Sequence, residues 1–528
     1  MSTHPGELMD PVSLEVMKNA FTFVPEEMGQ ALRRTAYSPN IKERMDASCA
    51  IFDARGRMVA QAEHIPVHLG SMPLAIQAIQ EYLQDPLEEG DQVILNDPYR
   101  GGSHLNDITL IKPVFWEEDL VGYAANKAHH ADVGGIAPGS MPTGSRTLYE
   151  EGVVLSPQKF LVRDRMDPLI QERVRKGMRD PRERMGDLHA QVAANNTGAR
   201  RFRAYLTKYG RTAFEAFADE IMDYSERRVR RALEKTPDGT YAAEDQLDDD
   251  GVLDEPLPLR VQVVLQGDAV TVDFTGTAEM SLGNVNAPYA VTLSSVYYVL
   301  RTLTDPAAPP NQGCYRPIRV VAPEDSLLNP RKPAAVAAGN VETSQRIVDV
   351  LLGAFAEALP DLVPAQSQGT MNNLLLGGRR GDHEFAYYET IGGGEGALPF
   401  RDGMSGVQTH MTNTLNTPIE ALETSYPFRV EAYHLRAGSG GKGRYHGGQG
   451  IVRSIRFLGK RGTVSLISER RRFPPKGLQG GLAGAAGVNS LIRGGDRLPL
   501  PSKTTMGIRR DDIIVVETPG GGGWGLPE

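Results

Sequence analysis

Cysteine is almost missing from this chain. Only two cysteines, Cys49 and Cys314, stand among its 528 residues. This excludes a disulfide framework, and it excludes the cysteine-rich sites that bind structural zinc or iron–sulfur clusters. A metal ion in this protein would therefore have to be held by histidine, aspartate and glutamate. Cys49 lies in an apolar stretch without a neighbouring base, so we expect it in the core.

Long apolar runs and an excess of positive charge are also lacking. No run reaches the about 18 apolar residues of a membrane span, and residues 1–12 lack the basic start and apolar stretch of a secretion signal. The chain carries 66 acidic and 57 basic side chains, a formal net charge of -9. An acidic balance disfavours nucleic acid or an anionic membrane as a partner. We expect a cytoplasmic protein.

The order of patterns along the chain predicts an α+β fold. At 528 residues the chain has room for roughly three domains or layered subdomains. The patterns divide it into four regions: a mixed α/β region with the candidate metal site (1–164), a charged helical segment (165–240), an α/β middle region (241–390) and a glycine-rich β region (391–528).

Local signals predict individual elements within these regions. Alternating apolar residues predict a strand hairpin over 49–61 and another from residue 108 onward, and helical spacing predicts helices over 288–303 and 343–359. Near the N-terminus we expect Pro25 to break or kink a helix, with a second short helix from Glu26 to Thr35. Pro181 and Gly210 are natural breaks between long helices of the charged segment.

Two clusters of histidine and aspartate lie within residues 96–140. One precedes a predicted strand and the other ends the strand that returns: His104 and Asp107, then His129, His130 and Asp132. Antiparallel pairing brings these two ends together, so the sequence predicts a site for a divalent metal. Because neighbouring residues of a strand point to opposite faces, we expect at most one of His129 and His130 to join the ligands. Asp132 is expected to orient a ring nitrogen or to contact a substrate.

Two further motifs are weaker. His64 and His68 stand four residues apart, but Pro66 between them excludes a helical ligand pair, so we expect a substrate contact or a structural role. Residues 438–443 match G-x-G-x-x-G, yet no helix follows to direct its N-terminus at a pyrophosphate. We therefore interpret these glycines as tight turns and expect no ATP site in this chain.

Several longer motifs together resemble the hydantoinase B/oxoprolinase family. They occur in order along the whole chain, at residues 37–46 (YSPNIKERMD), 64–72 (HIPVHLGSM), 96–107 (NDPYRGGSHLND), 129–135 (HHADVGG) and 518–525 (TPGGGGWG). The resemblance implies a metal-binding chain with the ligands Asp46, His104, Asp107 and His129. Spacing alone does not point to Asp46.

The resemblance also implies a division of labour. An A-type partner subunit with an actin-like ATPase fold would bind ATP and phosphorylate a small cyclic amide such as a hydantoin, 5-oxoproline or a lactam. This chain would complete the hydrolysis in a hetero-oligomer, with a divalent metal that lowers the pKa of a water molecule. We expect zinc, with manganese as the alternative.

The reaction needs groups that move a proton and hold a phosphate. Candidates for the catalytic carboxylate or imidazole, which the sequence does not rank, are Glu26, Glu27, His130 and Asp132. Arg44 and Lys127 could hold the phosphate, or could be solvated surface groups.

Two other interpretations stay open at this point. The same chemistry would suit a subunit of an ATP-dependent ketone carboxylase, acting on acetone or acetophenone. A third possibility is a metal-stabilised assembly subunit without chemistry of its own.

Overall fold

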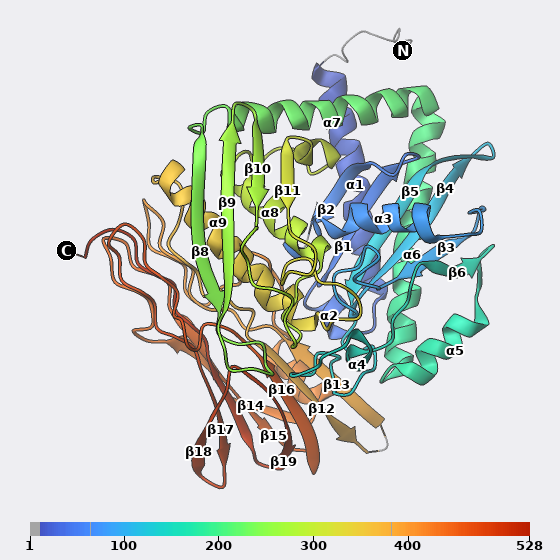
Figure 1. Cartoon of the computed structure of the whole chain (residues 1–528). Helices are drawn as coiled ribbons and strands as arrows, with labels where there is room; N and C mark the ends of the chain where they lie inside the picture. Colours follow the sequence, from blue (N-terminus) through green and yellow to red (C-terminus); the bar gives the residue numbers. More distant parts are fainter. Residues whose placement is uncertain (1–10, 64, 382, 528) are drawn as a thin grey trace.

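The computed structural model describes residues 11–63, 65–381 and 383–527, and these residues form a mixed α/β fold with four β-sheets (Figure 1). The largest has seven strands in the order β2-β1-β5-β4-β3-β6-β7. Its strands are β1 (Ala47–Asp53), β2 (Met58–Glu63), β3 (Gln92–Leu95), β4 (Asp107–Trp116), β5 (Asp119–His129), β6 (Gln158–Val162) and β7 (Arg165–Met166).

Both predicted hairpins are present in this sheet. β1 pairs with β2, and β4 pairs with β5, both antiparallel. In the second hairpin Asp107 stands opposite His129, at the end where β4 begins and β5 finishes. The expected meeting of the two polar clusters at one sheet end is therefore confirmed.

Long helices cover one face of this sheet. They are α1 (Pro11–Thr35), α6 (Pro181–Tyr209) and α7 (Arg211–Leu233), and the shorter α5 (Pro168–Gly177), which precedes α6, packs in a neighbouring core. The breaks expected at Pro181 and Gly210 are confirmed. The expectation of two helices divided at Pro25 is wrong, because α1 runs through that proline. The cost of the lost backbone hydrogen bond is offset by burial of apolar side chains on both sides of it, Phe21, Val24, Met28 and Leu32.

The opposite face of the sheet belongs to a second core. This core contains α3 (Ser71–Tyr82), α8 (Tyr289–Leu303) and α9 (Ser344–Ala358), and it continues to a four-stranded sheet in the order β11-β10-β9-β8. The strands of that sheet are β8 (Gly239–Leu247), β9 (Leu257–Gln266), β10 (Ala269–Asp273) and β11 (Ile318–Val321). The two buried helices predicted in the middle of the chain are α8 and α9.

The last part of the chain forms two further sheets, drawn in orange to red at the bottom of Figure 1. The first has the order β13-β12-β16-β19, and the second has the order β14-β15-β20-β17-β18. Their strands are β12 (Asn373–Arg380), β13 (His383–Glu389), β14 (Phe428–Arg436), β15 (Gly450–Phe457), β16 (Arg461–Ile467), β17 (Val488–Arg493), β18 (Asp496–Leu500), β19 (Lys503–Arg509) and β20 (Ile513–Glu517).

Short elements complete the described chain. They are α2 (Pro39–Lys42), η1 (Pro66–His68), α4 (Leu148–Glu151), η2 (Gln312–Tyr315), the π-helical turn η3 (Gly339–Thr343) and α10 (Ile419–Ser425). The division of the chain into four regions stays a prediction.

Glycine-rich segments without regular strands pack closely beside the C-terminal sheets. Residues 520–523 exchange backbone hydrogen bonds with segments near residues 366, 397, 441, 448 and 482. A Cβ atom at Gly521 would collide with the carbonyl oxygen of Glu395, so the segments approach at a distance that only glycine permits. The expected role of these glycines in tight backbone geometry agrees with this packing.

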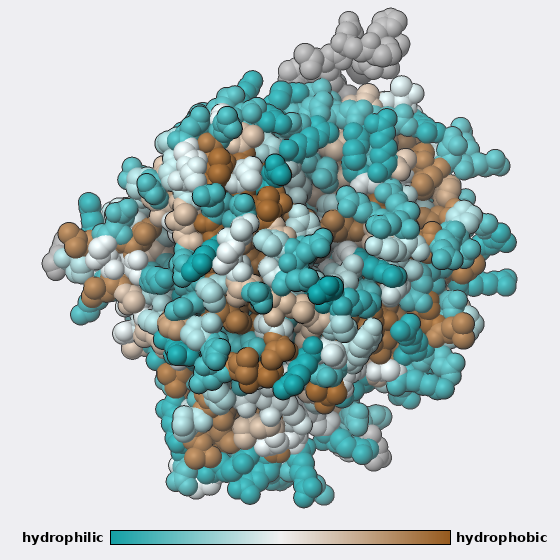
Figure 2. Space-filling view, in the orientation of Figure 1, coloured by the Kyte–Doolittle hydropathy of each residue, from teal (hydrophilic) through white to brown (hydrophobic). Residues whose placement is uncertain are grey.

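The surface gives two simple observations. Among the described residues no helix has the length and apolar character needed to cross a membrane. On the face drawn in Figure 2, hydrophilic side chains predominate and hydrophobic ones form small, scattered patches.

Candidate metal centre

His104, Asp107 and His129 meet at the end of the β4–β5 hairpin. His104 lies in the loop before β4, Asp107 begins β4 and His129 ends β5. The Nε2 atom of His104 lies 3.0 Å from Oδ1 of Asp107, and Nδ1 of His129 lies 3.1 Å from the same oxygen. The two ring nitrogens are 3.2 Å apart. One oxygen and two nitrogens therefore form a small triangle, and all three side chains are buried.

This triangle fits a divalent cation. Ligand atoms at about 2.1 Å from a cation such as zinc lie about 3.0–3.4 Å from one another. Burial also leaves Nδ1 of His104 and Nε2 of His129 without a hydrogen-bond partner among the described residues. Two imidazoles and a carboxylate suit zinc and also tolerate manganese, so the donor set leaves the metal's identity open.

The electrostatics keep Asp107 charged. Burial would raise the pKa of this carboxyl, but the charge of His104 and hydrogen bonds from His104, His129 and His68 outweigh it and hold the pKa well below its usual range. Ser103 also donates a hydrogen bond of 2.6 Å to Oδ2 of Asp107. For His129 burial dominates and lowers the pKa, which favours the neutral imidazole that a metal requires.

His68 stands at the edge of the triangle. Its Nε2 atom lies 3.4 Å from Oδ2 of Asp107, and the hydroxyl of Ser48 lies 2.9 Å from its Nδ1 atom. Sequence reasoning assigned this histidine only an unspecific role, because nothing in its spacing connects it with the β4–β5 hairpin. Its partner in the sequence motif, His64, lies outside the described residues.

Asp46 lies beside the triangle rather than in the group of converging ligand atoms. Its backbone carbonyl accepts a hydrogen bond of 3.0 Å from the amide of His129, and the charge of its buried carboxylate opposes the lowering of the pKa of that histidine by burial. The role of a fourth ligand, which the resemblance implies, stays a prediction for Asp46.

Two of the candidate proton-transfer residues point away from the triangle. His130 faces α6, where its Nε2 atom lies 2.9 Å from the side-chain oxygen of Gln191. Asp132 accepts hydrogen bonds from the amides of Gly134 and Gly139 and pairs with Arg179 at 3.1 Å, so it organises the loop after β5.

The two glutamates of α1 lie on the helix-covered side of the sheet. Glu27 pairs with Arg201 of α6, while the charge of Glu26 acts on Cys49 of β1. The structure therefore brings none of the four proposed proton-transfer residues into the triangle of ligand atoms.

The two candidate phosphate ligands are both buried, so a solvated surface role is excluded for them. Lys127 is 0% exposed, its ammonium lies 3.5 Å from the hydroxyl of Ser103, and burial lowers its pKa to about 8 while the charge of Asp107 opposes this. Arg44 donates hydrogen bonds to backbone oxygens of Tyr388 and Leu415, and its guanidinium lies 4.6 Å from the centre of the Tyr388 ring.

Tyr388, which sequence reasoning missed, covers the triangle from β13. Its ring stacks on the His129 ring, with centres 4.8 Å apart and planes inclined by 26°. The two residues are far apart in sequence, so only the assembled fold reveals the contact.

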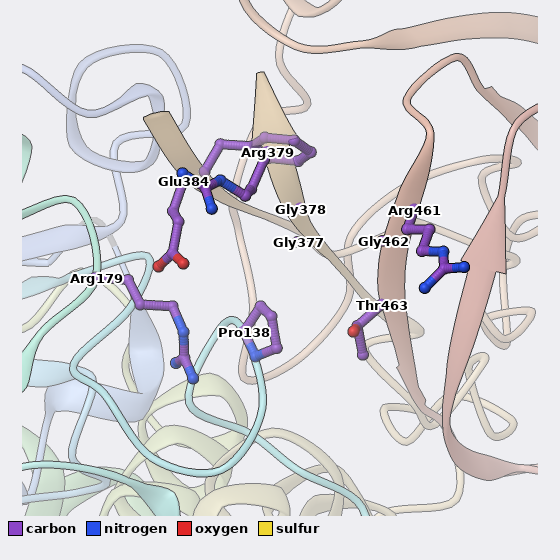
Figure 3. A pocket seen from close by; sticks show the side chains of 10 residues that line it. Pro138, Arg179, Gly377, Gly378, Arg379, Glu384, Arg461, Gly462 and Thr463 are labelled. Carbon is purple, nitrogen blue, oxygen red and sulfur yellow. The ribbon is translucent and has the colours of Figure 1, made fainter. Parts of the chain in front are cut away.

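A surface cleft of about 280 Å³ lies on the outer side of the loop that Asp132 organises (Figure 3). Pro138, Arg179, Glu384 and Arg461 are among its lining residues, and none of the metal-ligand candidates is. Because Arg179 already donates to Asp132 and to the carbonyls of Gly134, Gly135 and Ala137, it is committed to the loop.

Comparison with known proteins agrees with this fold. The family model for hydantoinase B/oxoprolinase matches residues 10–527, and the chain belongs to this family. The family is therefore that of the resemblance seen in the sequence.

Three relatives illustrate the range of the match. An uncharacterized protein of Methanocaldococcus jannaschii is 43% identical, with 98% of this chain and 91% of that protein covered. The 5-oxoprolinase of Dictyostelium discoideum is 40% identical over 98% of this chain, but the match spans only 40% of that enzyme. A putative D-/L-hydantoinase subunit from Pseudomonas sp. is 32% identical, with 98% and 90% covered.

Two solved structures share the fold. The ATP-dependent caprolactamase of Pseudomonas jessenii superposes with a TM-score of 0.91 at 27% identity, covering 98% of this chain and 92% of that chain. Acetone carboxylase in its nucleotide-free form superposes with a TM-score of 0.89 at 20% identity, covering 98% and 76%. The second likeness establishes the fold alone.

Proposed function

We propose that this chain is the metal-bearing subunit of an ATP-dependent hydrolase that opens cyclic amides. The observation that carries the proposal is the buried convergence of His104, Asp107 and His129, whose ligand atoms lie within 4.8 Å of one another. A divalent cation at this position, most suitably zinc, would polarise a substrate oxygen and lower the pKa of a water molecule.

The chain's own residues would prepare this chemistry. Asp107 supplies a charged carboxylate, His104 and His129 supply imidazole nitrogens, and Asp46 would complete the ligand set from the side. Lys127 adds a buried ammonium beside Asp107, where it would balance the negative charge of a phosphorylated substrate. Tyr388 and the second core shield the group from solvent, which strengthens each of these interactions.

An ATPase partner is part of the proposal. An amide carbonyl is a weak electrophile, so a partner that transfers phosphate from ATP to its oxygen would make that oxygen a good leaving group. More than half of the Dictyostelium 5-oxoprolinase lies outside the region that this chain matches, which supports a second unit with its own task. We propose that an A-type subunit with an actin-like ATPase fold fills this role in a hetero-oligomer in the cytoplasm.

Hydrolysis is preferred over the two other interpretations. The 5-oxoprolinase and caprolactamase likenesses are 40% and 27% identical, whereas the acetone carboxylase likeness, at 20%, carries no argument about activity. A role without chemistry is disfavoured by the likeness to 5-oxoprolinases and to caprolactamase, which are named as enzymes.

Metal analysis tests the site. We expect the purified chain to contain about one divalent ion and His104→Ala to lose most of it. His189→Ala, which removes an exposed histidine of α6, serves as the control and should retain the metal. Full metal retention in the His104 variant would contradict the assignment.

Activity is tested separately, by incubating the chain with ATP and an A-type partner. We expect opening of 5-oxoproline or a hydantoin only when both proteins are present. Bicarbonate-dependent consumption of acetone instead would establish the carboxylase interpretation.

A further inference from the structure

The turn before α9 carries a carboxyl group that hydrogen bonds link to the aromatic cover of the metal centre. Residues Gly339–Thr343 form a π-helical turn, a rare backbone geometry that is frequent at functional sites. Glu342 lies in this turn and is 0% exposed. The turn belongs to the second core, on the face of the seven-stranded sheet that α6 does not cover.

Hydrogen bonds connect Glu342 with the aromatic cover of the metal centre. Its Oε1 atom accepts a hydrogen bond of 2.7 Å from the side-chain amide of Asn373. The carbonyl oxygen of the same Asn373 side chain accepts a hydrogen bond of 2.9 Å from the hydroxyl of Tyr388. Because the Tyr388 ring stacks on His129, two hydrogen bonds and one ring contact separate Glu342 from a ligand of the triangle.

The second oxygen of Glu342 lacks a hydrogen bond of good geometry. Oε2 is buried and has no hydrogen-bond partner among the described residues. The side-chain oxygens of Asn340 and Gln345, which flank Glu342 on the same turn and at the start of α9, are unpartnered as well. A buried polar atom without a partner is costly, so the unpartnered Oε2 of Glu342 favours a polar ligand or a water molecule at this oxygen.

The surroundings keep this carboxyl protonated at neutral pH. Burial is the main cause and raises its pKa to about 8, with a further contribution from the charge of Glu469. The Thr370 hydroxyl and the charges of Lys503 and Arg471 oppose this but do not outweigh it. Tyr388, which Asn373 links to Glu342, has its own pKa raised by burial and stays neutral.

We propose that Glu342 is the group that holds and transfers the proton in the ring-opening reaction, an assignment that rests on the proposed function. A water molecule adds its hydroxyl to the phosphorylated carbon, the Oε2 proton passes to the ring nitrogen, and the other proton of the water returns to the Glu342 carboxylate. The proton of the added hydroxyl then reaches the nitrogen by the same route as the carbon–nitrogen bond breaks, which leaves an amine and an acyl phosphate. A second water hydrolyses the acyl phosphate to a carboxylate and inorganic phosphate. The protein therefore neither gains nor loses a proton in one turnover.

The test compares Glu342→Gln with Glu151→Gln. Glu151 is the matched control, because it is equally buried and its pKa is also raised to about 8, mainly by burial, but it binds only the Val336 and Ala337 amides and Ser145. Both variants are assayed for metal content and for opening of 5-oxoproline with ATP and the A-type partner. Infrared spectroscopy of the purified chains follows the carbonyl band of protonated carboxyls in the absence of substrate.

We expect Glu342→Gln to keep its metal, to lose one protonated-carboxyl band and to lower kcat at least about 100-fold, the usual scale of acid–base catalysis. Glu151→Gln should lose its own band but retain kcat. In the wild type, kcat should fall as the pH rises through about 8, and this fall should be absent from the residual activity of Glu342→Gln.

Two results would overturn the assignment. One is a Glu342→Gln enzyme with wild-type kcat and pH profile, and the other is an infrared spectrum in which Glu342 carries no proton at neutral pH. If Glu342→Gln does not fold, Glu342→Asp is the deciding variant. A reduced kcat that still decreases at alkaline pH supports the proposal, and a kcat that no longer decreases there contradicts the proposal. A wild-type enzyme that opens no ring is a failure of the proposed function, whereas the infrared result still reports on Glu342 itself.

Discussion

Asp107 and His129 face each other across the β4–β5 hairpin, with Nδ1 of the histidine 3.1 Å from Oδ1 of the aspartate. This pair is set by strand register, because a slip of one residue would turn His129 toward α6 and bring His130 to the triangle. The strand pairing therefore decides which of two adjacent histidines can bind a metal.

We expect the two histidines to differ sharply on substitution. His129→Ala should lower metal affinity by at least about 10-fold, since it removes a ligand candidate. His130→Gln should keep the metal, because His130 contacts Gln191 on the other face. Metal content after dialysis against a weak chelator measures the difference. Equal retention in both variants would contradict the assignment of His129.

Tyr388 is expected to stabilise the fold by packing over the metal centre, not by binding the metal. Tyr388→Phe removes only the hydroxyl donated to Asn373 and should lower the free energy of unfolding by about 1 kcal/mol. Tyr388→Ala also removes the ring between Arg44 and His129, so we expect a loss of about 3–5 kcal/mol. Urea unfolding of the metal-free chains gives both values. A Phe variant as unstable as the Ala variant would show that the hydroxyl, not the ring, matters.

Asp132 should prove structural. Its carboxylate binds two backbone amides and Arg179, so Asp132→Ala should lower the free energy of unfolding by about 2–4 kcal/mol and expose the loop after β5 to proteolysis. We expect the metal to remain bound. Loss of metal with an unchanged melting temperature would instead indicate a direct role at the centre.

The buried carboxyl of Glu151 should leave a mark on the pH dependence of stability. Burial raises its pKa from 4.5 to about 8 in the folded chain, so between these pH values the folded state holds a proton that the unfolded state has released. The free energy of unfolding therefore decreases as the pH rises across this window. Glu151→Gln should reduce that slope, as measured by urea unfolding at several pH values, and an unchanged slope would contradict the protonated state.

Much of the fold could be predicted from the sequence because its signals are local. The alternation at 49–61 and the helical spacing at 343–359 report burial on one face, and both elements appear where expected. Pro25 led to a wrong prediction of a helix break. The energetic cost of a proline inside a helix is smaller here than the stabilisation from packing Phe21 and Met28 on α6 and α7.

In the candidate site, too, contacts within one hairpin could be predicted and contacts between distant segments could not. His104, Asp107 and His129 belong to one hairpin, so antiparallel pairing was enough to bring them together. His68 and Tyr388 reach the centre from separate elements, Glu342 is linked to it through Asn373 and Tyr388, and no spacing within a single segment encodes such contacts. Asp46 came only from the family resemblance, which carries information that periodicity does not.

The glycine-rich segments should tolerate no side chain where they touch. At Gly521 an added Cβ would meet the backbone of Glu395, which cannot move without breaking its own hydrogen bonds. We expect Gly521→Ala to lower the melting temperature by several degrees, whereas Gly438→Ala, where the Cβ would meet no atom but the backbone has a φ of 74°, should cost about 1 kcal/mol. Differential scanning calorimetry compares the two, and equal melting temperatures would contradict the close packing.

This packing also has a genetic consequence. Any change at the first or second position of a glycine codon introduces a side chain or a stop, so the run Gly520–Gly523 presents eight nucleotide positions at which every missense change adds atoms. Each of these glycines lies against the backbone of another segment. We therefore expect this short C-terminal stretch, although it contains no catalytic group, to accept as few substitutions as the metal centre itself.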